Sequence, residues 1–262
     1  MPTILDPELQ CPLLHHGLVH LYPPEISVVY GACVALRETI EGDREWLDVH
    51  CQHVLPHSYG DLPAEILANG TQFWYKDGKR HRDGDLPAVI QADGSQYWFK
   101  DGKKHRDGDL TAEIRTNGTQ LWYRNGKKHR DGDLPAEIWA YGPQMWYKEG
   151  KRHRDGDLPA VIEVDGSQYW YLHGKKHRDG DLPAEIWADG SQLWYKEGNR
   201  HRDGDLPAMI LVNGRQMWYK EGKRHRDGDL PAVMCADGTQ LWYKEGKEYR
   251  DGDLSSMSVG GK

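Results

Sequence analysis

The sequence is poor in the residues that fill an ordinary hydrophobic core. It contains only 2 Phe, and its hydrophobic content is 37% over 262 residues. A core of Leu, Ile, Val and Phe is therefore excluded. Disorder is not expected either, because the chain holds 11 Trp and 14 Tyr and its formal net charge is only −7. With 30 Gly in addition, this composition predicts a β-rich repeat protein with an aromatic core.

Long apolar runs are also missing. No stretch of about 18 apolar residues occurs, so no transmembrane segment is predicted. The N-terminus lacks a basic region followed by an apolar run, so no signal peptide is predicted. The four cysteines, Cys11, Cys33, Cys51 and Cys235, are irregularly spaced, which favours a reducing compartment over a disulfide framework. We therefore expect a cytoplasmic protein, with a virion as the alternative location.

The negative charge is confined to one end of the chain. Residues 1–61 hold 2 basic and 9 acidic residues, which gives 2 − 9 = −7. The rest of the chain holds 34 − 2 = 32 basic and 41 − 9 = 32 acidic residues, which balance. A nucleic-acid binder needs a positive face, and nothing global would steer a polyanion to this balanced region.

Internal repetition dominates the sequence. Leucines recur every 24 residues from Leu62 to Leu254, and eight full repeats occupy 62–254. Residues 1–61 are predicted to be an acidic capping region that contains one degenerate repeat. Residues 255–262 are predicted to be a flexible tail.

Each repeat is predicted to contain two strands and no helix. In repeat 182–205, the segment 184–188 alternates, so Ala184, Ile186 and Ala188 should share a buried face while Trp187 points outward. The second strand, 192–196, should place neighbouring Trp and Tyr on opposite faces. Asn69-Gly70 and equivalent pairs predict two-residue hairpin turns, and a second Gly, such as Gly78, marks another turn. The predicted fold is all-β, an elongated array of stacked β-hairpins.

One recurrent stretch resembles the MORN repeat. Trp98-Phe99-Lys100-Asp101-Gly102-Lys103-Lys104-His105 is similar to the core of that repeat, and Asp93-Gly94-Ser95 is similar to its turn. The chain is also similar to 24-residue repeat proteins of large DNA viruses and microbes. The resemblance implies stacked hairpins, a scaffolding role, self-association and, in some members, contact with membrane lipids.

The run His-Arg-Asp-Gly-Asp recurs in the repeats and leaves several interpretations open. Paired Arg and Asp side chains are favoured, and calcium at the Asp-Gly-Asp turns is the alternative. The histidines are expected to pack on Trp or Tyr rings, with zinc as the weaker option, because they recur singly and without a fixed Cys. No catalytic residue, metal or cofactor is predicted, since no known catalytic or cofactor-binding motif is present.

The predicted function is a non-enzymatic scaffold for protein–protein interaction or assembly. The alternatives are a structural component of a particle such as a virion, and a module that binds anionic lipid or nucleic acid. We also expect a homodimer joined through its last repeats. The structural aromatics are predicted to be Trp74, Trp98, Trp122, Trp146, Trp170, Trp194, Trp218 and Trp242. The candidate binding face comprises Trp139, Trp187, Arg115 and Leu211, and the candidate polyanion strip comprises Lys79, Arg80, Lys103, Lys104, Lys127, Lys128, Lys151, Arg152, Lys175 and Lys176.

Overall fold

The computed structural model describes residues 57–58 and 61–249. They fall into two compact blocks, an N-terminal block that ends at Thr116 and a C-terminal block that begins at Asn117. The predicted tail 255–262 and nearly all of the predicted cap 1–61 lie outside the described residues. Every regular element in the described residues is a β-strand, so the all-β prediction is confirmed.

Each repeat contributes four short strands in a fixed order, except the last, in which the second and third strands are merged into β30. The first are β1 (Glu65–Ile66), β5 (Val89–Ile90), β9 (Glu113–Ile114), β13 (Glu137–Ile138), β17 (Val161–Ile162), β21 (Glu185–Ile186), β25 (Met209–Ile210) and β29 (Val233–Met234). The second are β2 (Gln72–Phe73), β6 (Gln96–Tyr97), β10 (Gln120–Leu121), β14 (Gln144–Met145), β18 (Gln168–Tyr169), β22 (Gln192–Leu193), β26 (Gln216–Met217) and β30 (Gln240–Lys244). The third are β3 (Tyr75–Lys76), β7 (Phe99–Lys100), β11 (Tyr123–Arg124), β15 (Tyr147–Lys148), β19 (Tyr171–Leu172), β23 (Tyr195–Lys196) and β27 (Tyr219–Lys220). The fourth are β4 (Lys79–Arg80), β8 (Lys103–Lys104), β12 (Lys127–Lys128), β16 (Lys151–Arg152), β20 (Lys175–Lys176), β24 (Asn199–Arg200), β28 (Lys223–Arg224) and β31 (Lys247–Tyr249).

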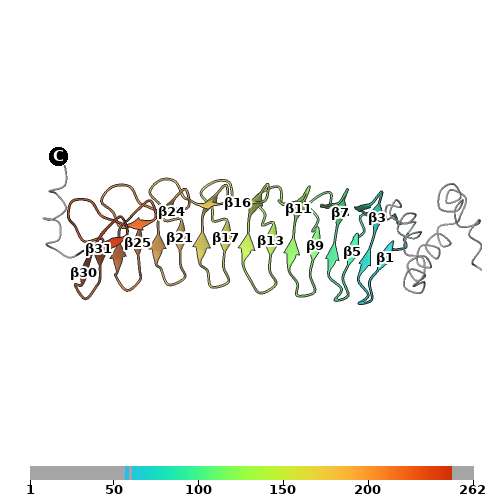
Figure 1. Cartoon of the computed structure of the whole chain (residues 1–262), viewed down its shortest axis with the longest axis horizontal. Helices are drawn as coiled ribbons and strands as arrows, with labels where there is room; N and C mark the ends of the chain where they lie inside the picture. The colour runs from blue at the N-terminus through green and yellow to red at the C-terminus, as the bar shows by residue number, and fades with distance from the viewer. Residues whose placement is uncertain (1–56, 59–60, 250–262) are drawn as a thin grey trace, which may run out of the picture. The chain divides into compact units, whose positions relative to one another are not determined.

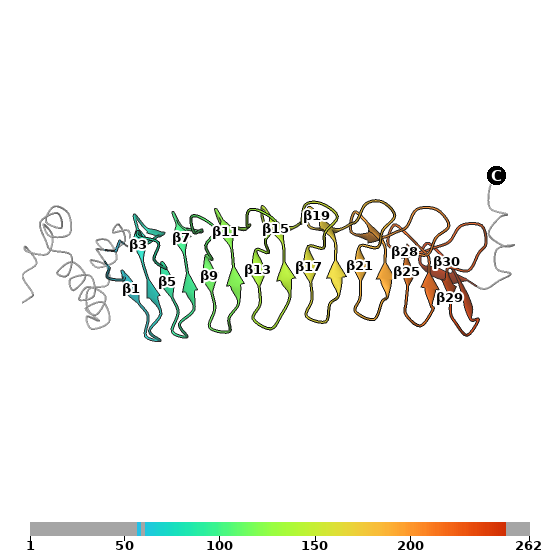
Figure 2. The ribbon, with the colours of Figure 1, turned by 180° about the vertical axis from the view of Figure 1, so that it is seen from behind.

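The first and second strands build antiparallel sheets in chain order. In the N-terminal block the order is β1-β2-β5-β6-β9. In the C-terminal block it is β10-β13-β14-β17-β18-β21-β22-β25-β26-β29-β30, with β31 paired to the second half of β30. Figure 1 shows these strands side by side in the C-terminal block, with connecting loops at one edge and small hairpins such as that of β16 at the other. Figure 2 shows the same hairpins from behind.

Two kinds of turn connect the strands, and only the second is the two-residue type. In repeat 182–205, the first loop is closed by the Trp187 N–H, which donates to the Ser191 carbonyl at 2.9 Å. Gly190 alone is left-handed there, with φ +89°, so three residues form the loop. The carboxylate of Asp189 accepts the Ser191 N–H at 2.8 Å, an Asx turn that keeps Asp189 out of the left-handed region. The predicted two-residue turns at Asn69-Gly70 and its equivalents are therefore wrong.

The small hairpin carries the true two-residue turn. Glu197 has φ +51° and Gly198 has φ +89°, and two successive left-handed residues define the type I′ turn that fits the twist of a tight hairpin. The Gly198 N–H also donates to the Lys176 carbonyl of the preceding hairpin at 2.9 Å. Successive hairpins within the block are thereby linked through their backbones.

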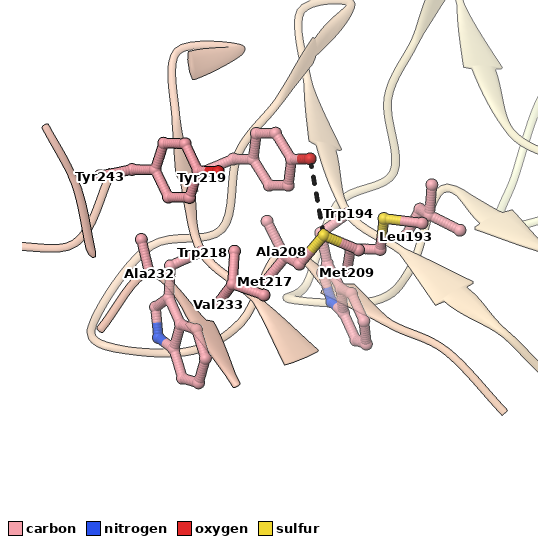
Figure 3. Packing of buried hydrophobic residues seen from close by; sticks show 10 residues of the cluster. All are labelled: Leu193, Trp194, Ala208, Met209, Met217, Trp218, Tyr219, Ala232, Val233 and Tyr243. Atoms are coloured by element: carbon pink, nitrogen blue, oxygen red, sulfur yellow. Dashed lines mark hydrogen bonds between the residues drawn. The ribbon is translucent and has the colours of Figure 1, made fainter. Parts of the chain in front are cut away.

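Both faces of the sheet are covered by side chains. In Figure 3 the rings of Trp194 and Trp218 lie on the side of the strands opposite to Tyr219 and Tyr243, as predicted. Between these layers, Leu193, Met209, Met217 and Val233 form a nearly solvent-free row in which each residue opposes the next across the ladder.

The predicted alternation of buried and exposed residues along the first strand is wrong, because side chains cover both faces of the sheet there. Ala184 is buried, but so is its neighbour Glu185, whereas Ile186 is half-buried and Ala188 is exposed in the loop. Alternation of buried and open residues requires a sheet with one solvated face, and this sheet has none at that point.

Candidate functional site

The repeated Trp side chains are buried or half-buried, and an arginine covers the ring of every one from Trp74 to Trp218. Seven of the eight predicted positions are at most 6% exposed, and Trp242, in the last described repeat, is half-buried. The backbone N–H of Trp146 donates to the Ala160 carbonyl of the next repeat at 2.8 Å. The guanidinium of Arg154 lies 3.9 Å from the centroid of the Trp146 ring, a favourable cation–π distance.

The same arginine links two repeats by charge. Arg154 donates from Nε and Nη2 to the two carboxylate oxygens of Asp133, at 2.5 and 2.8 Å, and from Nη1 to the Pro159 carbonyl at 3.2 Å. The hydrogen bond from Arg154 holds the pKa of Asp133 below its ordinary value. We call this arrangement of Trp, Arg and Asp the Arg–Trp staple. Its two-pronged pairing recurs at Arg106, Arg178, Arg202 and Arg226.

The repeated histidines join the first Asp of each turn to the next repeat. His81 Nδ1 accepts the backbone N–H of Asp101 at 3.2 Å, so the ring proton is on Nε2, which donates to Asp83 at 3.0 Å. Lys76 donates to the same Asp83 carboxylate at 3.2 Å. The hydrogen bonds from His81 first, then from Lys76, lower the pKa of Asp83.

These contacts bear on the interpretations left open for the His-Arg-Asp-Gly-Asp run. The predicted Arg–Asp pairing is present. Aspartates that were candidate calcium ligands, such as Asp83 and Asp133, are hydrogen-bonded to Arg, Lys or His side chains. Within the described ranges, no group of three or more His, Cys, Asp or Glu side chains is placed to hold a metal ion. Arginine occupies a face of the Trp146 ring, and His153 stacks on His173 with ring centroids 4.8 Å apart. That the histidines pack on Trp or Tyr rings stays a prediction.

The sequence reasoning missed a set of buried glutamates. Glu137, at 6% exposure, accepts from Lys128 Nζ at 2.6 Å and from the Trp139 indole N–H at 2.8 Å. Burial acts most strongly on its carboxyl and would raise the pKa, but the bonds from Lys128 and Trp139 outweigh it, so the pKa is lowered. Equivalent sites hold Glu185 with Lys176 and Trp187, and Glu113 with Lys104 and Arg115.

A signal for this network was present in the sequence. Wherever the residue nine positions before the first strand's buried residue is Lys, that buried residue is Glu: Lys104–Glu113, Lys128–Glu137 and Lys176–Glu185. Wherever it is Arg, the buried residue is Val or Met: Arg80–Val89, Arg152–Val161, Arg200–Met209 and Arg224–Val233. In the second class the guanidinium meets an aromatic residue instead: Arg80 lies over the rings of Phe73 and Phe99, and Arg200 lies 3.1 Å from the Tyr195 hydroxyl and 3.4 Å from that of Tyr219.

The residues of the candidate polyanion strip fall into two environments, one exposed and one half-buried. Its residues occupy the fourth strands, whose two positions differ in environment. Lys127 and Lys175 are exposed and pair with Glu149 and Glu197 of the next repeat. Their neighbours Lys128 and Lys176 are half-buried and pair with Glu137 and Glu185. Lys79, Arg80, Lys103 and Lys104 lie in the N-terminal block, and Lys127, Lys128, Lys151, Arg152, Lys175 and Lys176 in the C-terminal block.

The candidate binding face lies where the first strand enters its loop. Trp139 is 43% exposed, whereas Trp187 and Leu211 are half-buried, and all three belong to the C-terminal block. Arg115 is exposed and belongs to the N-terminal block. The same position holds Glu163 in the repeat between Trp139 and Trp187.

No protein-family model matches the chain, and no curated protein matches it either. The likeness to MORN repeats therefore stays a prediction. The part of the chain that the structure describes has no helix capable of crossing a bilayer.

Proposed function

We propose that the protein is a non-enzymatic repeat scaffold that binds other proteins through the loop edge of its sheets. The observation that supports this proposal is that constant and variable residues occupy different places in each repeat. The residues common to the repeats are engaged with one another, as in the Arg–Trp staple and the His–Asp–Lys contacts. The position that varies most stands at the loop edge and holds Leu67, Gln91, Arg115, Trp139, Glu163, Trp187, Leu211 and Cys235. A constant frame that presents changing side chains is the usual design of a repeat protein with an extended binding surface.

Self-association is part of this proposal. The outer edge of Gln240–Leu241 in β30 has no strand paired to it in the described residues, and Trp242 is less buried than its equivalents. Unpaired strand edges are association sites unless they are blocked. A contact between two identical ends is isologous and stops at a dimer.

The test is capture of partners by the purified chain. Wild-type protein, a chain shortened to begin at residue 62, and a variant with Trp139→Ala and Trp187→Ala would be compared as bait. We expect the double variant to lose partners that the shortened chain retains. Loss of the same partners from both would contradict binding through the loop edge, and light scattering at micromolar concentration would test the dimer.

A particle component is the second candidate, and it makes a different expectation: the chain would be found in purified particles of its source. The polyanion module is disfavoured because Lys127, Lys128, Lys175 and Lys176 are all paired with carboxylates. Binding of that kind would weaken steeply as salt rises.

A further inference from the structure

Three consecutive repeats of the C-terminal block place an unpaired carboxylate between two indole rings. Trp139, Glu163 and Trp187 occupy the same position, each directly after a first strand, β13, β17 and β21. Those strands are two ladder steps apart, since β14 lies between the first two and β18 between the last two. At about 4.8 Å per step, neighbouring members of the row stand roughly 10 Å apart. We call Trp139, Glu163 and Trp187 the Trp–Glu–Trp row.

The two indoles are held in place before any partner arrives. Trp139 donates to Glu137 at 2.8 Å, and Trp187 donates to Glu185 at 2.7 Å. Each of these glutamates is in turn bonded to a lysine, Lys128 or Lys176. Side chains fixed in this way lose little rotational freedom on binding, which favours them as recognition residues.

The carboxylate between them is not neutralised. Glu163 is half-buried, and in the described parts of the chain its carboxylate has no hydrogen bond and no ion pair. The repeat that carries it has Val161 where the flanking repeats have glutamate, and the residue nine positions before Val161 is Arg152, whereas a lysine stands nine positions before each of those glutamates. Arg152 is directed instead to the hydroxyl of Tyr171, at 3.4 Å. On either side of Glu163, Lys128 and Lys176 are paired with Glu137 and Glu185. Among the residues described, neither lysine forms an ion pair with Glu163.

The surroundings of the row reinforce its negative charge. The loops 139–143, 163–167 and 187–191 contain Glu163, Asp165 and Asp189 and no Lys or Arg, which gives 0 − 3 = −3. Tyr141, in the first of these loops, is 97% exposed and stands where the other repeats have Asn or Asp. Aromatic rings beside carboxylates are the chemistry that recognises cationic side chains, through cation–π contact and charge pairing.

We infer that the Trp–Glu–Trp row binds an extended, arginine-containing segment of a partner protein, an inference that rests on the proposed scaffold function. A chain in the extended polyproline II conformation advances about 3.1 Å per residue and completes a turn every three residues, so every third side chain points to the same side at a spacing of about 9 Å, close to that of the row. The central arginine pairs with Glu163. Arginines three residues to either side stack on Trp139 and Trp187, because a planar guanidinium stacks on an aromatic face as an ammonium does not.

The experiment uses the full-length chain and a synthetic nine-residue peptide with Arg at positions 2, 5 and 8 and Gly or Ser elsewhere. Binding is measured by calorimetry and by the change in tryptophan fluorescence. We expect micromolar affinity, and at least about tenfold weaker binding of the same peptide with citrulline in place of Arg. Glu163→Gln should weaken binding about tenfold, and Trp139→Leu and Trp187→Leu should each weaken it severalfold.

Glu197→Gln provides the matched control, because Glu197 is an exposed carboxylate of the same block that lies in a hairpin turn and pairs with Lys175. It should bind like the wild type, and far-UV circular dichroism should show that every variant is folded. No binding to the wild type, or equal binding by Glu163→Gln, would overturn the inference. Partner capture that depends on Trp139 and Trp187 but is not competed by the arginine peptide would overturn the charge chemistry alone and leave the scaffold function standing.

Discussion

The guanidinium of Arg154 lies 3.9 Å from the centroid of the Trp146 ring and donates two hydrogen bonds to the carboxylate of Asp133. One side chain therefore covers the aromatic core of a repeat and ties that repeat to the one before it. The arginine side chain is only 13% exposed, whereas Asp133 is 55% exposed, so the guanidinium is shielded from water but the carboxylate is not. This relationship, repeated along each block, explains how a chain with few aliphatic residues holds together.

Removal of the Arg–Trp staple should lower the stability of the fold. We expect Arg154→Ala to lower the free energy of unfolding by about 2 kcal/mol, because it strips the cover from Trp146 and leaves Asp133 unpaired. Arg154→Lys should recover little, since an ammonium cannot make the two-pronged contact. The measurement is chemical denaturation. Lys148→Ala is the control: Lys148 is 51% exposed and pairs with Asp155, so its loss should cost less than about 0.5 kcal/mol.

The two kinds of tryptophan should respond differently to truncation. Trp146→Ala removes a ring that is 6% exposed and should cost about 3–5 kcal/mol. Trp139→Ala removes a ring that is 43% exposed and one hydrogen bond to Glu137, so it should cost about 1 kcal/mol. Thermal or denaturant unfolding distinguishes the two variants. Equal losses of stability would show that the difference in burial between Trp139 and Trp146 is assigned incorrectly.

The buried glutamates predict a coupling that a double-mutant cycle can measure. Glu137→Val alone leaves Lys128 without its partner and should cost about 2–3 kcal/mol. Adding Lys128→Arg recreates the combination of Arg152 and Val161, so the double variant should regain about 1–2 kcal/mol of that loss. Simple additivity of the two substitutions would mean that the correlation between these positions has no energetic basis. Glu65→Val, at the equivalent but exposed position of β1, is the control.

Acid should unfold the blocks over a defined range. The hydrogen bonds from Lys100 first, then from His105, lower the pKa of Asp107 from its ordinary value of 3.8. Asp155, Asp203 and Asp227 are lowered in the same way. A carboxyl whose pKa is lower in the folded state stabilises that state fully above the unfolded pKa, and this stabilisation is lost as pH falls through the folded pKa. We therefore expect stability to decline below about pH 4, and the contribution of these aspartates would be contradicted if Asp107→Asn, Asp155→Asn and Asp203→Asn together left the acid midpoint unchanged.

One turn offers a stabilising substitution. Glu221 has φ +49° in the type I′ turn, a conformation that Asn adopts more easily than Glu, and Asn125 fills the same position in another repeat. No ion pair of Glu221 is present in the described residues. Glu221→Asn should therefore raise the unfolding free energy by about 0.5 kcal/mol. Glu221→Val should lower it, and denaturation midpoints would show whether the two changes have opposite signs.

The 24-residue spacing by itself determined the class of fold and much of the interior. A strand pattern that recurs without a slip cannot be satisfied by one hairpin, so it requires stacked neighbours, and a Trp in every repeat requires a buried site in every repeat. The glycines located the hairpin turns, because Gly adopts a left-handed backbone more readily than any other residue.

Only the tertiary structure decided which residues meet across repeats. Arg154 pairs with Asp133, twenty-one residues away, rather than with its neighbour Asp155, which His153 and Lys148 occupy. Glu185 accepts hydrogen bonds from Trp187, directly after its own strand, and from Lys176 on another strand, and no period along one strand can reveal the second partner. The row of Trp139, Glu163 and Trp187 likewise exists only in the stacked repeats, because residues 24 apart in the chain become neighbours when their strands share a ladder. Local sequence sets the conformation of a turn or strand, but partnership across a sheet depends on the register in which the repeats stack.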